Sequence, residues 1–334
     1  MAKKKHTVTS ILRPKVLPRA HPIESHRYLI FTPAVYLFFR IVLQWIQSGA
    51  SGGMIYGKPR HGKTCAIKCV ATLLVEELKV ALPIVTVCCR DHQHPGEARF
   101  FEDLLKDVGH VLWSSGKTSA KRHRLTEYLA ELVEKSGQDR LVLFVDEAQK
   151  LHEQHYKWLI DLHNELERRD IVLIVLLVGQ EELLHQFSAF QMTKKTQIIG
   201  RFMVRQLRFS GITNEKDLRT CLGNYDTGSE YPPESGCSFT RYYFPAAFES
   251  NLRLENYAPM LWQAFKEIRE EAQLPLTREI PMQYFCRSVE YVLTRFGKLG
   301  ELSEDFSLAQ WKDAIRQSGY ADAEQYVVDA ETHG

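Results

Sequence analysis

Gly57-Lys58-Pro59-Arg60-His61-Gly62-Lys63-Thr64 fits the pattern G-x-x-x-x-G-K-[ST] at every fixed position. A short apolar run, Met54–Tyr56, precedes it, and apolar residues recur at helical spacing over Lys63–Lys79. A glycine-containing turn between a strand and a helix lets backbone N–H groups surround phosphate oxygens, and the helix N-terminus adds the positive end of its dipole. The sequence therefore predicts a site for the phosphates of a nucleotide.

The residues of this turn have expected roles in binding ATP and Mg²⁺. Lys63 is expected to reach the β- and γ-phosphates and to take part in catalysis, and the Thr64 hydroxyl is expected to hold Mg²⁺. The predicted ATP-binding residues of this turn are Gly57, Lys58, Pro59, Arg60, His61, Gly62, Lys63, Thr64 and Cys65.

Two acidic residues follow an uninterrupted apolar run, Leu141–Val145. Such a run is typical of a central strand in a parallel sheet, and ligands bind at the carboxyl edge of these sheets. We therefore expect Asp146 to hold Mg²⁺ through water. We expect Glu147 to orient and polarise the attacking water.

Apolar runs alternate with helical patterns from about residue 28 to residue 210. Further strands are expected at Ile84–Cys89, Ile171–Val178 and Phe202–Leu207. This alternation predicts an α/β fold, an αβα sandwich with a parallel five-stranded sheet. The strand between the two motifs favours the ATPase branch of P-loop proteins over the kinase and GTPase branches, and no Asn-Lys-x-Asp guanine reader is present.

The pattern divides the chain into four parts. Residues 1–27 are expected to form a basic and polar arm, and residues 28–210 the P-loop ATPase domain. Strand patterns disappear after residue 210, so residues 211–320 are expected to form a smaller α-helical lid and C-terminal domain. Residues 321–334 are expected to form a polar tail.

Composition limits the kinds of partner that the chain can bind and indicates its compartment. The net charge of +2 in 334 residues excludes a uniformly basic nucleic-acid-binding surface, so any such contact depends on a local patch. Seven cysteines without a disulfide pattern indicate a reduced, cytoplasmic protein. The apolar segment Tyr28–Ile46 has membrane-spanning length but contains Pro33 and Arg40, so we expect a buried helix and no membrane partner.

The order of these elements resembles AAA+ ATPases. The strand Ile171–Val178 is followed by Gly179-Gln180, and by this resemblance Gln180 takes the first sensor position at the γ-phosphate, where the family more often has Asn. Arg201, just before the last strand, takes the position of the arginine finger, with Arg205 as the alternative. A finger acts on the neighbouring subunit, so the resemblance implies a homo-oligomer. Arg253 takes the position of a second sensor on the lid, among the ATP-binding residues.

Within AAA+, three segments resemble the TnsC/TniB transposition regulators: His94–Gly109, Asp146–Leu151 and Leu177–Leu183. The resemblance implies a bacterial cytoplasmic ATPase that assembles with ATP·Mg as a ring or filament on duplex DNA. It would link a target-site selector to the transposase and disassemble on hydrolysis. Two alternatives stay open: a secretion or signalling ATPase without a DNA partner, and an ATP-switched DNA-binding protein with negligible hydrolysis.

One segment is a candidate for the DNA contact. Ser114–Arg124 combines hydroxyl groups with four Lys and Arg residues and is expected to project as a loop. Such a loop suits contact with the phosphate backbone without reading of the bases. The alternative is a solvated charged loop. The candidate DNA-binding residues are Lys117, Thr118, Lys121, Arg122 and Arg124.

Overall fold

The protein, described by a computed structural model over residues 13–92, 94–275, 279–297 and 305–333, forms two compact units. The sheet unit runs from Ala34 to Ser210. The helical unit joins the segment before Ala34 to the segment from Gly211 onwards. Residues 1–12, the first part of the expected basic arm, lie outside the described residues.

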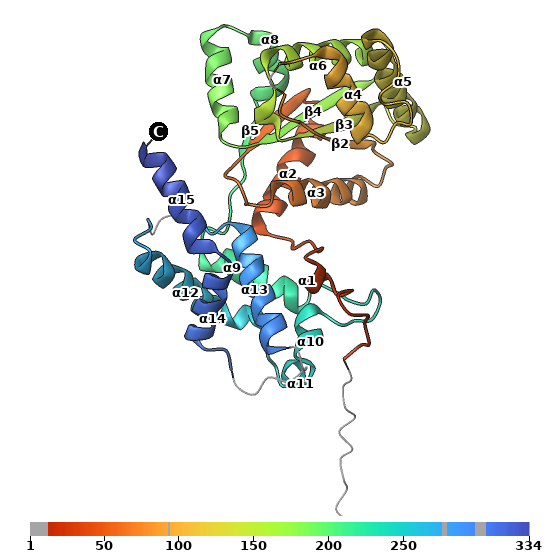
Figure 1. Cartoon of the computed structure of the whole chain (residues 1–334). Coiled ribbons are helices and arrows are strands. Elements are labelled where there is room, and N and C mark those ends of the chain that lie inside the picture. The colour runs from red at the N-terminus through yellow and green to blue at the C-terminus, as the bar shows by residue number, and fades with distance from the viewer. Residues whose placement is uncertain (1–12, 93, 276–278, 298–304, 334) are drawn as a thin grey trace, which may run out of the picture. The chain divides into compact units, whose positions relative to one another are not determined.

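A parallel five-stranded sheet with the order β2-β3-β4-β1-β5 forms the centre of the sheet unit (Figure 1). The structure confirms the predicted parallel sheet of five strands. β4 lies between β1, which leads into the glycine turn, and β3, which ends in the acidic pair. The strands are β1 (Gly52–Tyr56), β2 (Ile84–Cys88), β3 (Arg140–Asp146), β4 (Val172–Gly179) and β5 (Gln206–Arg208).

Helices cover both faces of this sheet, as the αβα prediction requires. Figure 1 shows α2 (Pro33–Gln47) and α3 (Lys63–Leu78) against one face. The helices α4 (Glu97–Asp107), α5 (Thr118–Ser136), α6 (Glu153–Glu167) and α7 (Glu182–Met192) pack their apolar residues against the other. Alternate residues of β3 pack in the two cores. Leu143 packs in the core on the α4–α7 side of the sheet, and Phe144 packs in the core on the α2–α3 side. Burial on both faces explains why β3 and β4 read as continuous apolar runs.

The last predicted strand, Phe202–Leu207, is wrong over residues 202–205. Ile199–Met203 forms a turn of π-helix, η2, after the short helix α8 (Thr196–Ile198), and β5 begins only at Gln206. Phe202 and Met203 are fully buried in the core on the α4–α7 side of the sheet. Their apolar character comes from packing of the helical turn and not from a strand.

The helical unit contains helices from two separate segments of the chain. α12 and α13 pack against α14, and a single antiparallel bridge joins Ile212 to Ile280. Residues 321–333, described above as a polar tail, belong to the helix α15. The helices are α1 (Pro22–Ser25), α9 (Glu215–Asp226), α10 (Phe239–Tyr243), α11 (Pro245–Glu249), η3 (Leu254–Tyr257), α12 (Ala258–Glu271), α13 (Met282–Phe296), α14 (Leu308–Gln317) and α15 (Tyr320–His333).

Residues 28–33, assigned to the ATPase domain from the sequence, pack instead in the helical unit. The Tyr28 hydroxyl donates to Glu290 Oε1 at 2.8 Å and lies 3.0 Å from the Tyr225 hydroxyl. Ile30 is buried in the same core. The apolar run Tyr28–Ile46 is therefore shared between the two cores, and its residues from Pro33 onwards belong to α2.

The apolar run Tyr28–Ile46 has the length of a membrane-spanning segment. In the part of the chain that the structure describes, no helix combines the length and the apolar character needed to cross a membrane. α2 instead buries Phe38, Val42 and Ile46 against the sheet.

Candidate nucleotide site

The turn between β1 and α3 has a backbone that requires its glycines. A Cβ atom at Gly57 would lie 2.1 Å from the carbonyl oxygen of Phe209, so any larger residue would collide with the chain beside it. Gly62 caps α3 with a φ of 93°, and Arg60 has a φ of 65°. The turn is therefore tight, and it delivers the next residue, Lys63, to the first position of the helix.

Lys63 is held by the turn itself. Its Nζ donates to the carbonyl oxygens of Gly57, at 2.6 Å, and of Lys58, at 2.7 Å. The side chain is 8% exposed. Burial lowers the pKa of Lys63, and the nearby carboxylates of Glu147 and Asp146 partly offset this change. A buried ammonium group at a helix N-terminus suits an anionic partner such as a phosphate group.

The two predicted motifs meet, although they are 82 residues apart in the chain. The Thr64 hydroxyl donates to Asp146 Oδ2 at 2.7 Å, and the Glu147 N–H donates to Asp146 Oδ1 at 2.9 Å. A hydroxyl and a carboxylate side by side match the hard oxygen ligands that Mg²⁺ prefers. Among the described residues, no group of three or more His, Cys, Asp or Glu could hold a metal. A Mg²⁺ ion at Thr64 and Asp146 would thus need phosphate and water oxygens to complete its shell.

Glu147 leaves the sheet in an unusual conformation. Its φ is 55°, in the left-handed region that non-glycine residues seldom adopt. Its Oε2 accepts from Gln149 Nε2 at 2.9 Å and lies 3.2 Å from Lys150 Nζ. The side chain is 32% exposed, so solvent reaches the carboxylate.

Gln180 follows β4 directly, at the sheet edge where the two motifs meet. Because β4 separates β1 from β3, Gln180 leaves the sheet between Lys63 and the acidic pair. Its backbone N–H donates to Gln149 Oε1 at 3.1 Å, and its side chain is half-buried. The position fits the sensor role that the sequence predicts, and that role stays a prediction.

The three predicted arginines each contact their own unit. Arg201, in η2, has its Nη1 2.9 Å from His163 Nδ1, and burial together with this guanidinium lowers the pKa of His163. Arg205, the alternative finger, is half-buried, and its carbonyl oxygen accepts from the Met54 N–H at 2.8 Å. Arg253 belongs to the helical unit, where its guanidinium lies 3.6 Å from the ring centroid of Phe248.

The predicted DNA-binding loop is wrong from Thr118 onwards, because α5 begins there. Lys121 is 6% exposed and pairs with Glu102 of α4. Arg122 pairs with Glu97 of the same helix and also lies 3.7 Å from Asp161. These two cations hold α5 against its neighbours, so they are not free for a phosphate backbone.

The loop before α5 agrees in part with the predicted DNA contact. Arg124 donates to the carbonyl oxygens of Leu112, at 2.7 Å, and Ser115, at 2.9 Å. These two hydrogen bonds hold the backbone of the loop against α5. Lys117 is exposed and Thr118 is half-buried at the N-terminus of α5. Of the five candidates, Lys117 is thus the one whose charge projects outward.

Sequence reasoning missed two features near these candidates. Gln149 and Lys150 contact the acidic Glu147, and their closeness in sequence to the acidic pair was an available signal. The loop also exposes an apolar tip, with Val111 89% and Leu112 54% exposed. The apolar run Val111–Trp113 is only three residues long, between His110 and Ser114, and gives too short a pattern to indicate an exposed tip.

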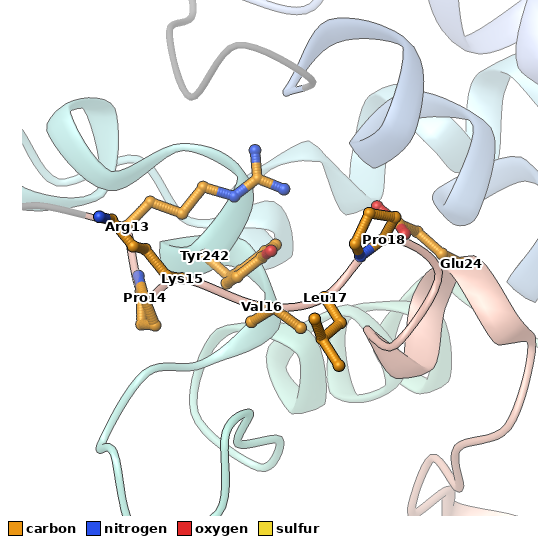
Figure 2. A pocket seen from close by; sticks show the side chains of 8 residues that line it. All are labelled: Arg13, Pro14, Lys15, Val16, Leu17, Pro18, Glu24 and Tyr242. Carbon is orange, nitrogen blue, oxygen red and sulfur yellow. The ribbon is translucent and has the colours of Figure 1, made fainter.

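A separate hollow lies on the helical unit. Figure 2 shows the extended segment Arg13–Pro18 passing Tyr242, with Glu24 beside it. The Arg13 guanidinium lies 4.0 Å from the ring centroid of Tyr242. None of the residues lining this hollow belongs to the predicted sites.

Comparisons with known proteins agree with this geometry. Residues 46–187 match a family described as AAA domain, a range that contains the glycine turn, the acidic pair and Gln180. The ORC2 protein of Aeropyrum pernix, solved as ADPNP-ADP complexes, has a TM-score of 0.55 and 15% identity, covering 89% of this chain and 71% of that chain. Its ADP form has a TM-score of 0.51 and 16% identity, covering 86% and 68%. No curated protein matches the sequence. The chain thus contains a segment that matches an AAA domain, and it has the AAA+ fold, followed by a helical region.

Proposed function

We propose that the chain hydrolyses ATP and uses the bound nucleotide to control its assembly on duplex DNA. The hydrogen bond of 2.7 Å from Thr64 to Asp146 carries the first part of this proposal. It places the phosphate-binding turn and the acidic pair at one point of the sheet edge. The similarity to a protein solved as ADPNP-ADP complexes supports an adenine nucleotide.

Each side chain of the site has a defined task in this proposal. Lys63 and the backbone of the turn bind the triphosphate, and Asp146 with Thr64 would hold Mg²⁺, which would supply charge neutralisation at the phosphates. Glu147 orients the attacking water and accepts its proton. Gln180, at the end of β4, contacts the γ-phosphate.

DNA assembly is the finer part of the proposal and rests on the loop between α4 and α5. Lys117 is exposed there, in the same segment between the two helices as the apolar tip Val111–Leu112. One cation per subunit gives weak binding, and a ring or filament multiplies it, so assembly should be cooperative and sensitive to salt. By its resemblance to TnsC/TniB, we propose that this assembly regulates DNA transposition between a target selector and a transposase.

A gel-shift assay with labelled duplex at low salt tests both parts. The wild-type chain should shift DNA with ATP and Mg²⁺ and lose the shift as ATP is consumed. Lys63→Ala should abolish nucleotide binding and the shift. Glu147→Gln should bind ATP and prolong the shift at least about tenfold, because hydrolysis is blocked.

Lys117→Ala tests the proposed contact, and Lys135→Ala is its matched control, because Lys135 is 74% exposed at the other end of α5. Lys117→Ala should weaken the shift about tenfold and reduce its salt dependence, and Lys135→Ala should leave both unchanged. Equal behaviour of the two variants would rule out the loop as the DNA contact.

A second function, an ATPase acting on proteins without a DNA partner, is favoured by one observation. Lys121, Arg122 and Arg124 are engaged within the sheet unit and leave little exposed charge at the expected DNA contact. This alternative predicts ATP hydrolysis that duplex DNA neither stimulates nor slows. ATP turnover with no shift at low salt would establish it over the DNA proposal.

A further inference from the structure

The Gln149 side chain uses both ends of its amide in the nucleotide site. Its Nε2 donates to Glu147 Oε2 at 2.9 Å, and its Oε1 accepts from the backbone N–H of Gln180 at 3.1 Å. A backbone N–H only donates and an ionised carboxylate only accepts, so this orientation of the amide is the one that satisfies both partners. A single side chain therefore joins the end of β3 to the end of β4.

The surroundings hold Gln149 in this position. A Cβ atom at Gly179 would lie 2.5 Å from Gln149 Oε1, so the glycine makes room for the amide. The Gln149 carbonyl oxygen accepts from Gln186 Nε2 at 2.7 Å. Gln186 in turn accepts from the hydroxyl of Tyr156 at 2.7 Å, and Tyr156 is fully buried. The backbone of Gln149 is thus anchored to the core through α7 and α6.

The second contact of Glu147 is less constrained. Lys150 Nζ lies 3.2 Å from the same carboxylate oxygen, but this lysine side chain is 36% exposed and flexible. An exposed ion pair of this kind contributes little to position. The direction of the Glu147 carboxylate is therefore set mainly by Gln149.

We propose that Gln149 is a positioning residue for ATP hydrolysis, which transmits a movement of Gln180 at the γ-phosphate to the carboxylate of Glu147. This inference rests on the proposed hydrolysis. In this proposal Gln149 acts by aiming Glu147 and needs no contact of its own with the nucleotide. When nucleotide shifts the end of β4, the hydrogen bond from Gln180 to Gln149 carries the shift to Glu147.

Gln149→Met tests this, because methionine has a similar length and neither donates nor accepts strongly. The turnover number kcat should fall about 10- to 100-fold, the size expected when a catalytic group is misplaced by about 1 Å. Nucleotide affinity, measured with a fluorescent ATP analogue, should stay within about threefold. Gln154→Met is the matched control, because Gln154 is exposed on α6, and it should keep wild-type kinetics.

A double-mutant cycle decides whether Gln149 acts through Glu147. In single-turnover assays, Glu147→Gln combined with Gln149→Met should be no slower than Glu147→Gln alone. A further loss equal to that of Gln149→Met in the wild type would overturn the proposal, as would wild-type kcat in Gln149→Met. If Gln149→Met lowers the melting temperature, Gln149→Asn, which is too short to bridge both partners, should show the same split between kcat and affinity.

The outcomes separate this inference from the proposed function. Wild-type hydrolysis in Glu147→Gln would overturn the proposed catalytic role of Glu147 and, with it, the basis of the inference. Slow hydrolysis in Glu147→Gln together with normal hydrolysis in Gln149→Met would overturn the inference alone.

Discussion

His21 is a histidine that the folded chain keeps neutral. It is 1% exposed and stacks on Tyr242 with ring centroids 4.2 Å apart. Its Nδ1 accepts the N–H of Ile23 at 3.2 Å and so caps α1, a role that protonation of Nδ1 would end. Burial, aided by the positive charge of Arg13, lowers the pKa of His21 from 6.5 to about 4.

The stability of the helical unit should therefore fall in mild acid. Below pH 6.5 the unfolded chain gains a proton at His21, whereas the folded chain gains it only near pH 4. The contribution of neutral His21 is complete above pH 6.5 and is lost as the pH falls to about 4, a change on the order of 3 kcal/mol. Urea denaturation of wild type and His21→Phe between pH 7 and pH 4 should show a flatter dependence for the variant.

His185→Phe is the matched control for that series, because His185 is exposed on α7. It should keep the wild-type dependence of unfolding free energy on pH. An unchanged slope in His21→Phe would show that the pKa of this histidine is the same in the folded and the unfolded chain.

Some residues of the site could be predicted from the sequence, and others could not. Thr64 and Asp146 meet as expected, because the glycine turn is a local motif and the acidic pair follows an uninterrupted apolar strand. The closeness of Gln149 to the acidic pair is visible in the sequence, but its contact with Gln180 is not, and neither is the contact of His21 with Tyr242, because these partners are distant in sequence. Spacing within a sequence carries no information about such partners.

At the scale of the elements, the first turns of α5 carry cations with two different tasks. Lys121 is buried against α4 by its pair with Glu102, whereas Lys117 is exposed just before the helix. The sequence alone does not show which cation of a charge run is paired and which is exposed. The fold determines this, because α5 turns Lys121 toward α4.

Lys121→Ala should therefore change stability, and Lys117→Ala should not. Removal of Lys121 leaves Glu102, whose side chain is 31% exposed, without its partner and opens space beside α4. The cost should be about 1–3 kcal/mol, discounted because solvent reaches Glu102. Differential scanning calorimetry should show a lower melting temperature for Lys121→Ala alone; equal melting temperatures would contradict the buried pair.

Elements with two apolar faces were the easiest to predict. β3 and β4 enter both cores, and their runs leave no other interpretation. The turn η2 was misread as a strand, because Phe202 and Met203 are apolar for packing in a helical turn. The start of α5 was misread as a loop, because its charged face, paired with α4, lacks the apolar spacing of a helix.

At the scale of the whole molecule, Arg201 links the site to assembly if it serves as an arginine finger. A finger acts on the nucleotide of a neighbouring subunit, so its removal should matter only in the assembled state. Within one chain the Arg201 guanidinium lies against His163, at the edge of the sheet unit's core.

Arg201→Ala should keep the nucleotide affinity of the isolated chain within about threefold but lose the rise of hydrolysis with protein concentration. The loss should reach about a thousandfold in the assembled state. Arg205→Ala, the alternative finger, should keep that rise. If Arg205→Ala loses it and Arg201→Ala does not, the roles are exchanged; if both keep it, hydrolysis needs no finger from these residues.

The division of the chain into two units could be predicted in part from its sequence. The change from alternating strands to helices near residue 211 coincides with the start of the second segment of the helical unit. The return of residues 13–33 to that unit was not legible, because Tyr28 finds Tyr225 and Glu290 only in the folded chain.

The strand order gives β4 a position that no other strand has. It lies between the strand that presents Lys63 and the strand that presents Asp146, and Val178 pairs with Ile55 while Leu177 pairs with Val145. Any widening of the sheet at β4 must therefore pull the ammonium group and the carboxylate apart together. Motion at the glycine turn and motion at the acidic pair are consequently coupled through this one strand.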